Sequence, residues 1–291
     1  MEQTLPTESS QASNLQALLS QIGALPTPVR VYDEMTSLLA NPRTSTRDVA
    51  GAVAADQAIT ARLLKLVNSP FYGFPEKITT VSRAVTIIGL QALQNLVLAS
   101  AVIGLFEAKH RNKHAFNLDQ LWTHSLATGL AARSIAKRLD HADGEEYLVA
   151  GLMHDMGKAV LLSYFPVQVD AILDIVQQQG CLFIEGERQV LGIDHAAIGA
   201  AIAEQWRLPG PLRDAIRMHH TPSKATDGIR ASAVHLADIL ARSLLLGSGG
   251  DRGMPALNSV AYRMLNLKEE DLRSIMKDVI TDVAAEKISL Q

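Results

Sequence analysis

A histidine next to an aspartate inside an apolar segment is the first sign of chemistry in this chain. His154 and Asp155 lie in the stretch GLMHDMGK, residues 151–158, which periodicity places within a helix. Adjacent side chains on an α-helix project about 100° apart, so an imidazole nitrogen and a carboxylate oxygen can straddle one cation. One turn later, the ammonium of Lys158 can hold Asp155 in place or meet a phosphate oxygen of a substrate. Taken alone, the stretch fits equally well a buried, hydrogen-bonded histidine beside an Asp–Lys ion pair.

Further histidines and an aspartate in the same half of the chain could complete a metal site. They are His124, His195, His219, His220 and Asp238. Their spacing suits the helix-and-return of a helical bundle, which brings one imidazole per helix to a common core. Together with His154 and Asp155 they exceed the three or four protein ligands, roughly, that one zinc needs, so two cations sharing Asp155 are possible. Imidazole mixed with carboxylate favours iron or manganese over calcium, and zinc stays open.

Each of these histidines also has a structural interpretation. His124 fits a polar position at a helix interface, and His195 follows Asp194, a plausible N-cap, in the first turn of a helix. His219 and His220 precede a helix end, where cations are favoured. The remaining histidines are predicted to be surface or packing residues: His110, His114, His141 and His235.

The elements that must position these residues are helices throughout, which predicts an all-α fold. No stretch alternates with period two long enough to indicate a strand. In the first half, helices are expected from Leu25, from near Thr46 with Ser45 or Thr46 as its cap, from Asp56, over about 81–88, and from after Gly89 toward Phe106. In the second half, helices are expected near residues 120–139, 145–164, 167–179, 195–206, 210–220 and 229–246, followed by two C-terminal ones.

Composition shifts divide the chain into four predicted parts. Residues 1–20 are polar and predict a flexible tail, and residues 21–108 predict an N-terminal helical subdomain. A charged linker opens the segment 109–246, which is predicted to be a helical bundle carrying the metal site. Residues 247–291 begin with the Gly-rich stretch GSGGDRGMP, which predicts a flexible connection, and end in helices.

Composition and charge exclude several functional classes. The 291 residues carry 27 Lys and Arg against 30 Asp and Glu, a net charge of −3, which argues against a broad nucleic-acid surface. Cys181 is the only cysteine, so an intramolecular disulfide is excluded. There is no signal-peptide pattern at the N-terminus, and the longest apolar stretches, such as 97–106, are too short to span a bilayer. These features predict a cytoplasmic protein without membrane association.

The motifs of both halves resemble known families. The second half is similar to the HD superfamily of metal-dependent phosphohydrolases, whose lone His, His-Asp pair and distal Asp fall on His124, His154, Asp155 and Asp238. The first half, with LPTPVRVYDEM, DVAGAVAADQAITARLLKLVNSPFYG and ITTVSRAVTIIGLQAL, resembles the HDOD domain, the HD-related output domain of bacterial signalling proteins. The similarity continues through LWTHS, GLMHDMGK, DHAAIGAAIAEQWRLP and AIRMHH, and so covers about Leu25 to Asp238.

Some features of the resemblance favour phosphodiesterase activity, and others argue against it. The related HD-GYP group hydrolyses cyclic di-GMP at a multinuclear metal centre, and its extra histidines match His195, His219 and His220. The Gly-Tyr-Pro motif is missing here, and Gln120 stands where some relatives place a metal-binding Glu. These departures argue against a third metal and against that group's substrate-recognition loop. HDOD proteins are generally regulatory output or scaffold modules, so metal ligands do not by themselves imply catalysis.

Three functional interpretations follow from this resemblance. The leading one is a signal-transduction protein that acts through contacts with a signalling partner or a nucleotide and holds one or two divalent ions in its second half. The alternative is a phosphodiesterase for a cyclic dinucleotide or another phosphodiester, with Asp155 bridging two cations and Lys158 steadying the developing charge. The third is a scaffold with the same fold and no metal, whose polar core is held by hydrogen bonds alone.

Overall fold

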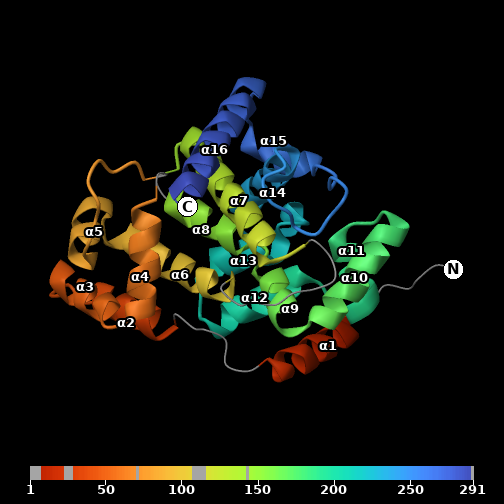
Figure 1. Ribbon diagram of the computed structural model, residues 1–291, viewed down its shortest axis with the longest axis horizontal. Coiled ribbons are helices and arrows are strands. Elements are labelled where there is room, and N and C mark those ends of the chain that lie inside the picture. The colour runs from red at the N-terminus through yellow and green to blue at the C-terminus, as the bar shows by residue number, and fades with distance from the viewer. Residues whose placement is uncertain (1–7, 23–28, 70–71, 107–115, 142–143, 290–291) are drawn as a thin grey trace.

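The computed structural model describes residues 8–22, 29–69, 72–106, 116–141 and 144–289 (Figure 1). This part of the chain consists of helices and connecting loops and contains no strand. The predicted all-α fold class is therefore confirmed.

An N-terminal lobe is built from five consecutive helices. They are α2 (Val29–Leu39), α3 (Thr46–Ala54), α4 (Gln57–Val67), α5 (Val81–Ile88) and α6 (Leu90–Phe106). Two of the expected starts are capped as their sequences predict. Ser45 forms a capping box with Asp48 at the start of α3, and the Asp56 carboxylate accepts from the Ile59 N–H at 3.0 Å at the start of α4.

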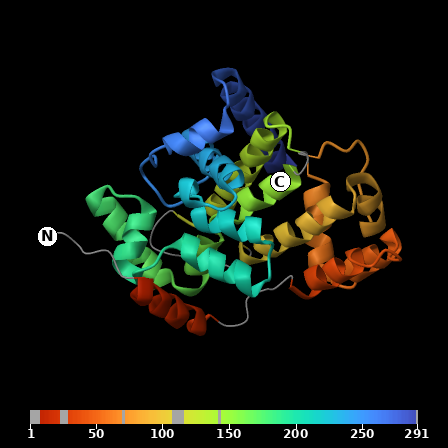
Figure 2. The ribbon, with the colours of Figure 1, turned by 180° about the vertical axis from the view of Figure 1, so that it is seen from behind.

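A larger bundle follows the lobe and is joined to it where α6 packs on its helices. Its first helices are α7 (Leu118–Arg138), α8 (Gly144–Met153), α9 (Met156–Tyr164), α10 (Pro166–Gln179) and α11 (Phe183–Leu191). Next come α12 (His195–Gln205), α13 (Gly210–Met218), the 3₁₀ turn η1 (Pro222–Lys224) and α14 (Gly228–Ser243). The chain ends in α15 (Ser259–Leu265) and α16 (Glu269–Ser289). Seen from behind, α12 and α13 lie between α1 (Glu8–Gln21) and the N-terminal lobe (Figure 2).

The single helix predicted over 145–164 is wrong, because the chain breaks at His154 and Asp155. α8 ends at Met153, α9 begins at Met156, and Asp155 has φ −101° and ψ 15°. The Gly151 carbonyl oxygen accepts a hydrogen bond from His154 Nδ1 at 2.6 Å. Such a side-chain contact competes with helical backbone bonds and favours the turn. The break moves both predicted ligand side chains into the space between helices.

Two further helices were absent from the sequence-based expectation. Residues 8–21, assigned to a tail, form α1, and Leu18 is buried against the bundle. α11 was not predicted because its apolar face carries a carboxylate, Glu187, which interrupts the hydrophobic pattern. Of the linker expected at 109–119, residues 109–115, with His110 and His114, lie outside the described residues, whereas Leu118 and Asp119 already belong to α7.

Among the residues that the structure describes, buried apolar side chains form two hydrophobic clusters. One fills the lobe around residues such as Met35, Leu63 and Leu93, and the other fills the bundle around α7 and α8. Within the described ranges, no single helix combines the length and apolarity needed to cross a membrane. The pair Gly144–Tyr164 and Pro166–Gln179 meets both criteria jointly but is bent by 116°.

Candidate metal centre

Close helix approaches bring the predicted ligand positions together inside the bundle. A Cβ atom on Gly151 of α8 would lie 2.6 Å from Gly129 Cα of α7, and one on Gly157 of α9 would lie 2.1 Å from the His195 carbonyl oxygen of α12. Only glycine permits such contacts between backbones. The two glycines flank the turn that carries His154 and Asp155, so this turn is held between α7 and α12.

All seven predicted ligands lie at one place in the bundle. They come from five parts of the fold: His124 from α7, His154 and Asp155 from the turn, His195 from the start of α12, His219 and His220 from the end of α13, and Asp238 from α14. His220 is partly buried, and each of the others is 1% exposed or less. The structure therefore brings together the whole predicted set.

One oxygen of Asp155 faces the first group of ligands. Asp155 Oδ2 lies 3.3 Å from His154 Nε2 and 3.7 Å from His124 Nε2. On the other side of this group, Asp238 Oδ1 lies 3.0 Å from His124 Nε2 and 3.9 Å from His154 Nε2. Two imidazole nitrogens and two carboxylates thus surround one point.

The other oxygen of Asp155 faces the second group. Asp155 Oδ1 lies 3.1 Å from His195 Nε2 and 3.8 Å from His219 Nε2. His195 Nε2 is in turn 3.4 Å from His219 Nε2 and 2.9 Å from His220 Nε2. Three like nitrogens at these separations form a set that could hold one ion. Asp155 is placed between the two groups, one oxygen toward each.

Hydrogen bonds on the outer nitrogens set the tautomers of the inner histidines. The Nδ1 atoms of His154 and His219 face the carbonyl oxygens of Gly151 and Ile216 at 2.6 and 2.8 Å. A carbonyl oxygen only accepts, so each Nδ1 donates, and in the neutral ring Nε2 keeps its lone pair toward the centre. His195 Nδ1 lies 2.5 Å from Glu187 Oε2. This pattern, an outer oxygen behind an inner imidazole, is typical of metal ligands.

Unsatisfied atoms at the centre test whether the residues fit a metal. His124 Nε2, His154 Nε2 and Asp155 Oδ1 are buried and make no hydrogen bond within the described part of the chain. Buried polar atoms are nearly always paired, and a group of exceptions is characteristic of a place where an ion binds. Each of the three atoms lies 3.0 to 3.9 Å from an atom of another candidate ligand, so the residues fit one or two divalent ions.

The electrostatics of the centre favour the neutral form of His124, His219 and His220 and the charged form of the ligand carboxylates. Burial lowers the pKa of His219 and His220 well below the ordinary imidazole value, and neighbouring histidines act in the same direction. Burial also lowers the pKa of His124, against the effect of Asp238. Burial by itself would raise the pKa of Asp155, but His154 and Lys158 outweigh it and hold that pKa well below its ordinary value. Metal ligands need these protonation states.

His195 differs from the other histidines because it lies between two carboxylates. Burial opposes its charge, but Glu187 and Asp155 outweigh that effect and raise the pKa of His195 to about 9. Burial raises the pKa of Glu187. The pKa of His195 thus differs in direction from the pKa values of His124, His219 and His220.

Two basic side chains lie at the edge of the centre. Lys158 Nζ donates to Asp155 Oδ2 at 2.9 Å, as the holding role predicted for it requires. Arg242, which the sequence did not single out, donates through Nε to Asp238 Oδ1 at 2.7 Å. Arg242 also holds the pKa of Asp238 well below its ordinary value, although burial acts in the opposite sense. Each ligand carboxylate thus has a basic partner.

The Gly-rich stretch lies over this edge of the centre. We call residues 247–258 the covering loop. The Ser248 N–H donates to the Gln120 carbonyl oxygen at 3.0 Å, and Lys158 Nζ donates to the Gly249 carbonyl oxygen at 2.9 Å. Beneath the loop the remaining cavity measures about 10 Å³ and touches His195, His220 and Lys158. A cavity of that size barely holds one water molecule.

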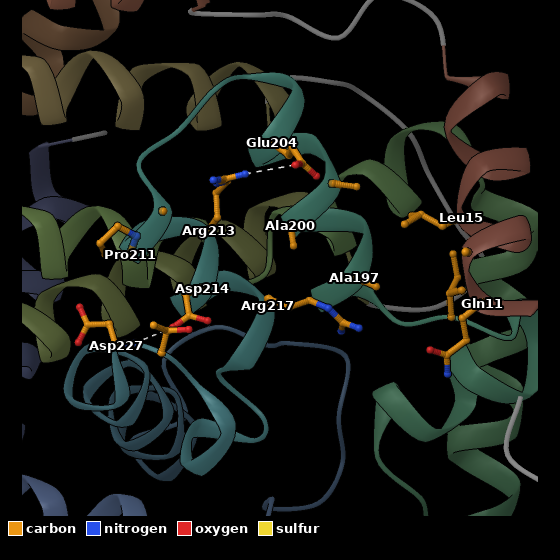
Figure 3. A pocket seen from close by; sticks show the side chains of 15 residues that line it. Gln11, Leu15, Ala197, Ala200, Glu204, Pro211, Arg213, Asp214, Arg217 and Asp227 are labelled. Atoms are coloured by element: carbon orange, nitrogen blue, oxygen red, sulfur yellow. Dashed lines mark hydrogen bonds and ion pairs between the residues drawn. The ribbon is translucent and has the colours of Figure 1, made fainter. Parts of the chain in front are cut away.

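A larger hollow of the described surface lies elsewhere. This groove has a volume of about 790 Å³ and runs between α1, α12 and α13 (Figure 3). Its arginines are paired with carboxylates: Arg213 lies 3.3 Å from Glu204, and Arg217 lies 3.7 Å from Asp194. It contains none of the seven predicted ligands. The groove is thus separate from the candidate centre.

Sequence reasoning missed three residues that shape the centre: Glu187, Arg242 and Asp251. Glu187 follows Phe183 by four positions, on the apolar face of α11, and a carboxylate at such a position is a usable signal. Arg242 follows Asp238 by one turn, a spacing typical of ion pairs. Asp251 lies in a loop and carries no comparable pattern.

His235, expected to pack, is 3% exposed and faces the His219 carbonyl oxygen through Nδ1 at 2.8 Å.

Comparisons with known proteins agree with this architecture. The family model of the HDOD domain matches residues 25–222. An uncharacterized protein of Treponema pallidum (strain Nichols) is 29% identical over 218 residues, which are 72% of this chain and 41% of that protein. The chain therefore spans less than half the length of that relative.

Solved structures share the fold at low sequence identity. An HDOD domain protein with unknown function from Geobacter sulfurreducens matches with a TM-score of 0.78 and 24% identity, over 96% of this chain and 98% of its own. A candidate signal transduction protein from Marinobacter aquaeolei VT8 has a TM-score of 0.74 and 19% identity, and the match covers 98% of this chain and 66% of that protein's chain. A candidate phosphohydrolase from Shewanella amazonensis SB2B has a TM-score of 0.64 and 23% identity, and the match covers 92% of this chain and 98% of that protein's chain. At these identities the likeness concerns the fold alone.

Proposed function

The chain belongs to the HDOD domain family, and on this premise we propose that it is a bacterial signal-transduction protein whose bundle holds one or two divalent transition-metal ions. The observation that supports the proposal best is the position of Asp155. Its two oxygens face separate groups of buried imidazoles at 3.1 to 3.8 Å. A carboxylate between two histidine groups is an arrangement suited to a shared ligand of two cations.

The donor set indicates the kind of metal. His124, His154 and Asp238 would hold one ion, His195, His219 and His220 the other, with Asp155 between them. Imidazole and carboxylate together suit iron or manganese, with zinc as a further candidate. Ions bound there would supply Lewis-acid stabilisation of negative charge.

Burial favours regulation over open catalysis as the role of this centre. The covering loop leaves a cavity of only about 10 Å³ beside His195 and His220, too small for a nucleotide. A regulatory role does not require a nucleotide to reach the centre. A partner can instead bind the N-terminal lobe and respond to how α6 packs this lobe on the bundle. We expect the partner to be another signalling protein that contacts the N-terminal lobe.

A phosphodiesterase acting on a cyclic dinucleotide or another phosphodiester is the second candidate, and one contact favours it. Lys158 Nζ is 2.9 Å from Asp155 Oδ2 and faces the small cavity. In this role Lys158 would donate to a phosphate oxygen, while Asp155 would keep its charge and orient the imidazoles. This activity requires the covering loop to move.

Metal content and binding together test the proposal. Protein purified anaerobically and reconstituted with Fe²⁺ or Mn²⁺ should retain at least one equivalent by elemental analysis, and Asp155→Ala should lose most of it. His141→Ala, a histidine outside the centre, serves as the matched control. A folded parent protein that retains less than about a tenth of an equivalent would leave only the metal-free scaffold.

Activity assays then separate the two metal-dependent roles. Turnover of cyclic di-GMP or a simpler phosphodiester that disappears in His154→Ala and Asp155→Ala supports the phosphodiesterase. Capture of a partner through residues 25–106 that neither substitution changes supports the regulatory role.

A further inference from the structure

One carboxylate of the covering loop is held entirely by groups that bind anions. Asp251 Oδ1 accepts a hydrogen bond from the Phe183 N–H at 2.5 Å. Its other oxygen, Oδ2, accepts a short hydrogen bond from Arg242 Nη1 and lies 3.8 Å from Lys158 Nζ. The Asp251 side chain is only 5% exposed. A loop aspartate has thus been brought into the protein and placed among three donors.

The same two basic residues also bind the proposed metal ligands. Arg242 Nε donates to Asp238, and Lys158 Nζ donates to Asp155. Asp251 therefore lies next to the candidate metal centre and is joined to it through the side chains of Arg242 and Lys158. An anion at this position would have one edge on Arg242 and Lys158 and would sit beside the small cavity that reaches His195 and His220.

We propose that Arg242, Lys158 and the Phe183 N–H form a binding site for the phosphate group of a phosphoester ligand, and that Asp251 occupies this site in place of the ligand. A guanidinium fork, an ammonium and a backbone N–H are the groups that commonly bind phosphate oxygens. The inference rests on the proposed function and deepens it, because it identifies the groups that would bind the phosphate and the residue that occupies their place.

The packing of the covering loop shows that the ligand and the loop exclude each other. A Cβ atom on Gly249 would lie 3.1 Å from Arg242 Nη2 and 3.2 Å from Lys158 Nζ. Gly250 has φ +88°, and a Cβ there would lie 2.7 Å from the Phe183 ring. These glycines place the loop backbone directly on the binding groups, so a phosphate can enter only when residues 248–251 move away.

The Asp251 carboxylate competes with phosphate for the same groups. Because it is part of the same chain, it lowers the apparent affinity for phosphate. A tethered group acts as a competitor at an effective concentration in the millimolar range or above. Removing the Asp251 carboxylate should therefore strengthen phosphate binding by about tenfold or more.

The experiment measures the affinity of the full chain for inorganic phosphate by isothermal titration, as purified and again after chelator treatment. Asp251→Asn keeps the shape of the side chain, and Asp251→Ala removes it, and both should bind phosphate about tenfold more tightly than the parent. Asp278→Asn is the matched control, because it removes the same charge from another Arg-paired aspartate, whose Oδ2 lies 3.1 Å from Arg138 Nη2. This control should bind like the parent.

A double variant locates the site. Asp251→Asn combined with Arg242→Lys should lose the gain in phosphate affinity that Asp251→Asn alone produces, because the guanidinium fork is absent. Folded Asp251 variants that bind phosphate no more tightly than the parent would overturn the inference, as would a gain that persists in the double variant. Metal content is recorded for the same samples. Failure of the proposed function would appear as absent metal, whereas failure of this inference would appear as an unchanged phosphate affinity after chelation.

Discussion

Glu187 Oε2 lies 2.5 Å from His195 Nδ1, and the same oxygen accepts from the His195 backbone N–H at 3.1 Å. Both side chains are fully buried. One carboxylate thus fixes both the ring and the first turn of α12, and it directs His195 Nε2 toward Asp155. Glu187 is a positioning residue for the second histidine group.

Replacing Glu187 tests this relationship. Glu187→Gln should lower the affinity for Mn²⁺ by about 10- to 100-fold, the typical effect of removing an outer partner of a ligating histidine. It should also lower the pKa of His195, which NMR titration of the chelated protein measures. Glu204→Gln, at a side chain that is 75% exposed, is the control. Equal Mn²⁺ affinity in parent and variant would show that Glu187 does not position His195.

The contact of Gly157 with α12 predicts a loss of stability. Its Cβ position lies 2.1 Å from a backbone oxygen, so Gly157→Ala must push α9 away from α12, at a cost of about 1–3 kcal/mol in the free energy of unfolding. Gly51→Ala is the matched control, because nothing lies within 4 Å of its Cβ position and alanine favours a helix interior by about 0.5–1 kcal/mol. Urea unfolding measures both changes. A Gly157→Ala variant as stable as the parent contradicts the close approach.

The histidine pKa values predict how the stability of the chelated protein depends on pH. Because His219 and His220 have folded pKa values below the ordinary one, their contribution is present above about pH 6.5 and is lost as the pH falls. His195 has a raised folded pKa, so its contribution is present below about pH 6.5 and is lost as the pH rises through about 9. The free energy of unfolding should therefore peak near neutral pH.

Urea titrations at pH 5, 7 and 9 measure this profile. Each histidine contributes a slope of at most about 1.4 kcal/mol per pH unit. His219→Gln should flatten the decline between pH 7 and pH 5. A stability that rises steadily from pH 7 to pH 5 would contradict the neutral state of His219 and His220.

Sequence reasoning selected candidate ligands that lie close together in the fold, because helical spacing and chemical type are local properties. His154, Asp155 and Asp238 stand out as polar residues in apolar segments, and the bundle brings them together as their spacing predicts. The capped starts at Ser45 and Asp56 were predictable for the same reason, since a cap depends on the next three residues. The metal-binding role of these residues stays a prediction.

The parts that sequence reasoning missed depend on contacts between distant segments. The turn at His154 is held between α7 and α12, while the apolar pattern around it continues through the break. Asp251 is separated from Phe183 by 68 residues, and nothing near it indicates that it is buried. Glycines in the covering loop predict freedom of the backbone, whereas here they permit close packing against Arg242 and Phe183.

Anomalous diffraction tests the central claim most directly. Crystals grown anaerobically with Mn²⁺ and measured at the manganese absorption edge should show peaks on both sides of Asp155. One should lie about 2.0–2.3 Å from ligand atoms of His124, His154 and Asp238, and the other within the same distance of His195, His219 and His220. Well-ordered crystals without any peak beside these seven side chains would contradict the metal centre.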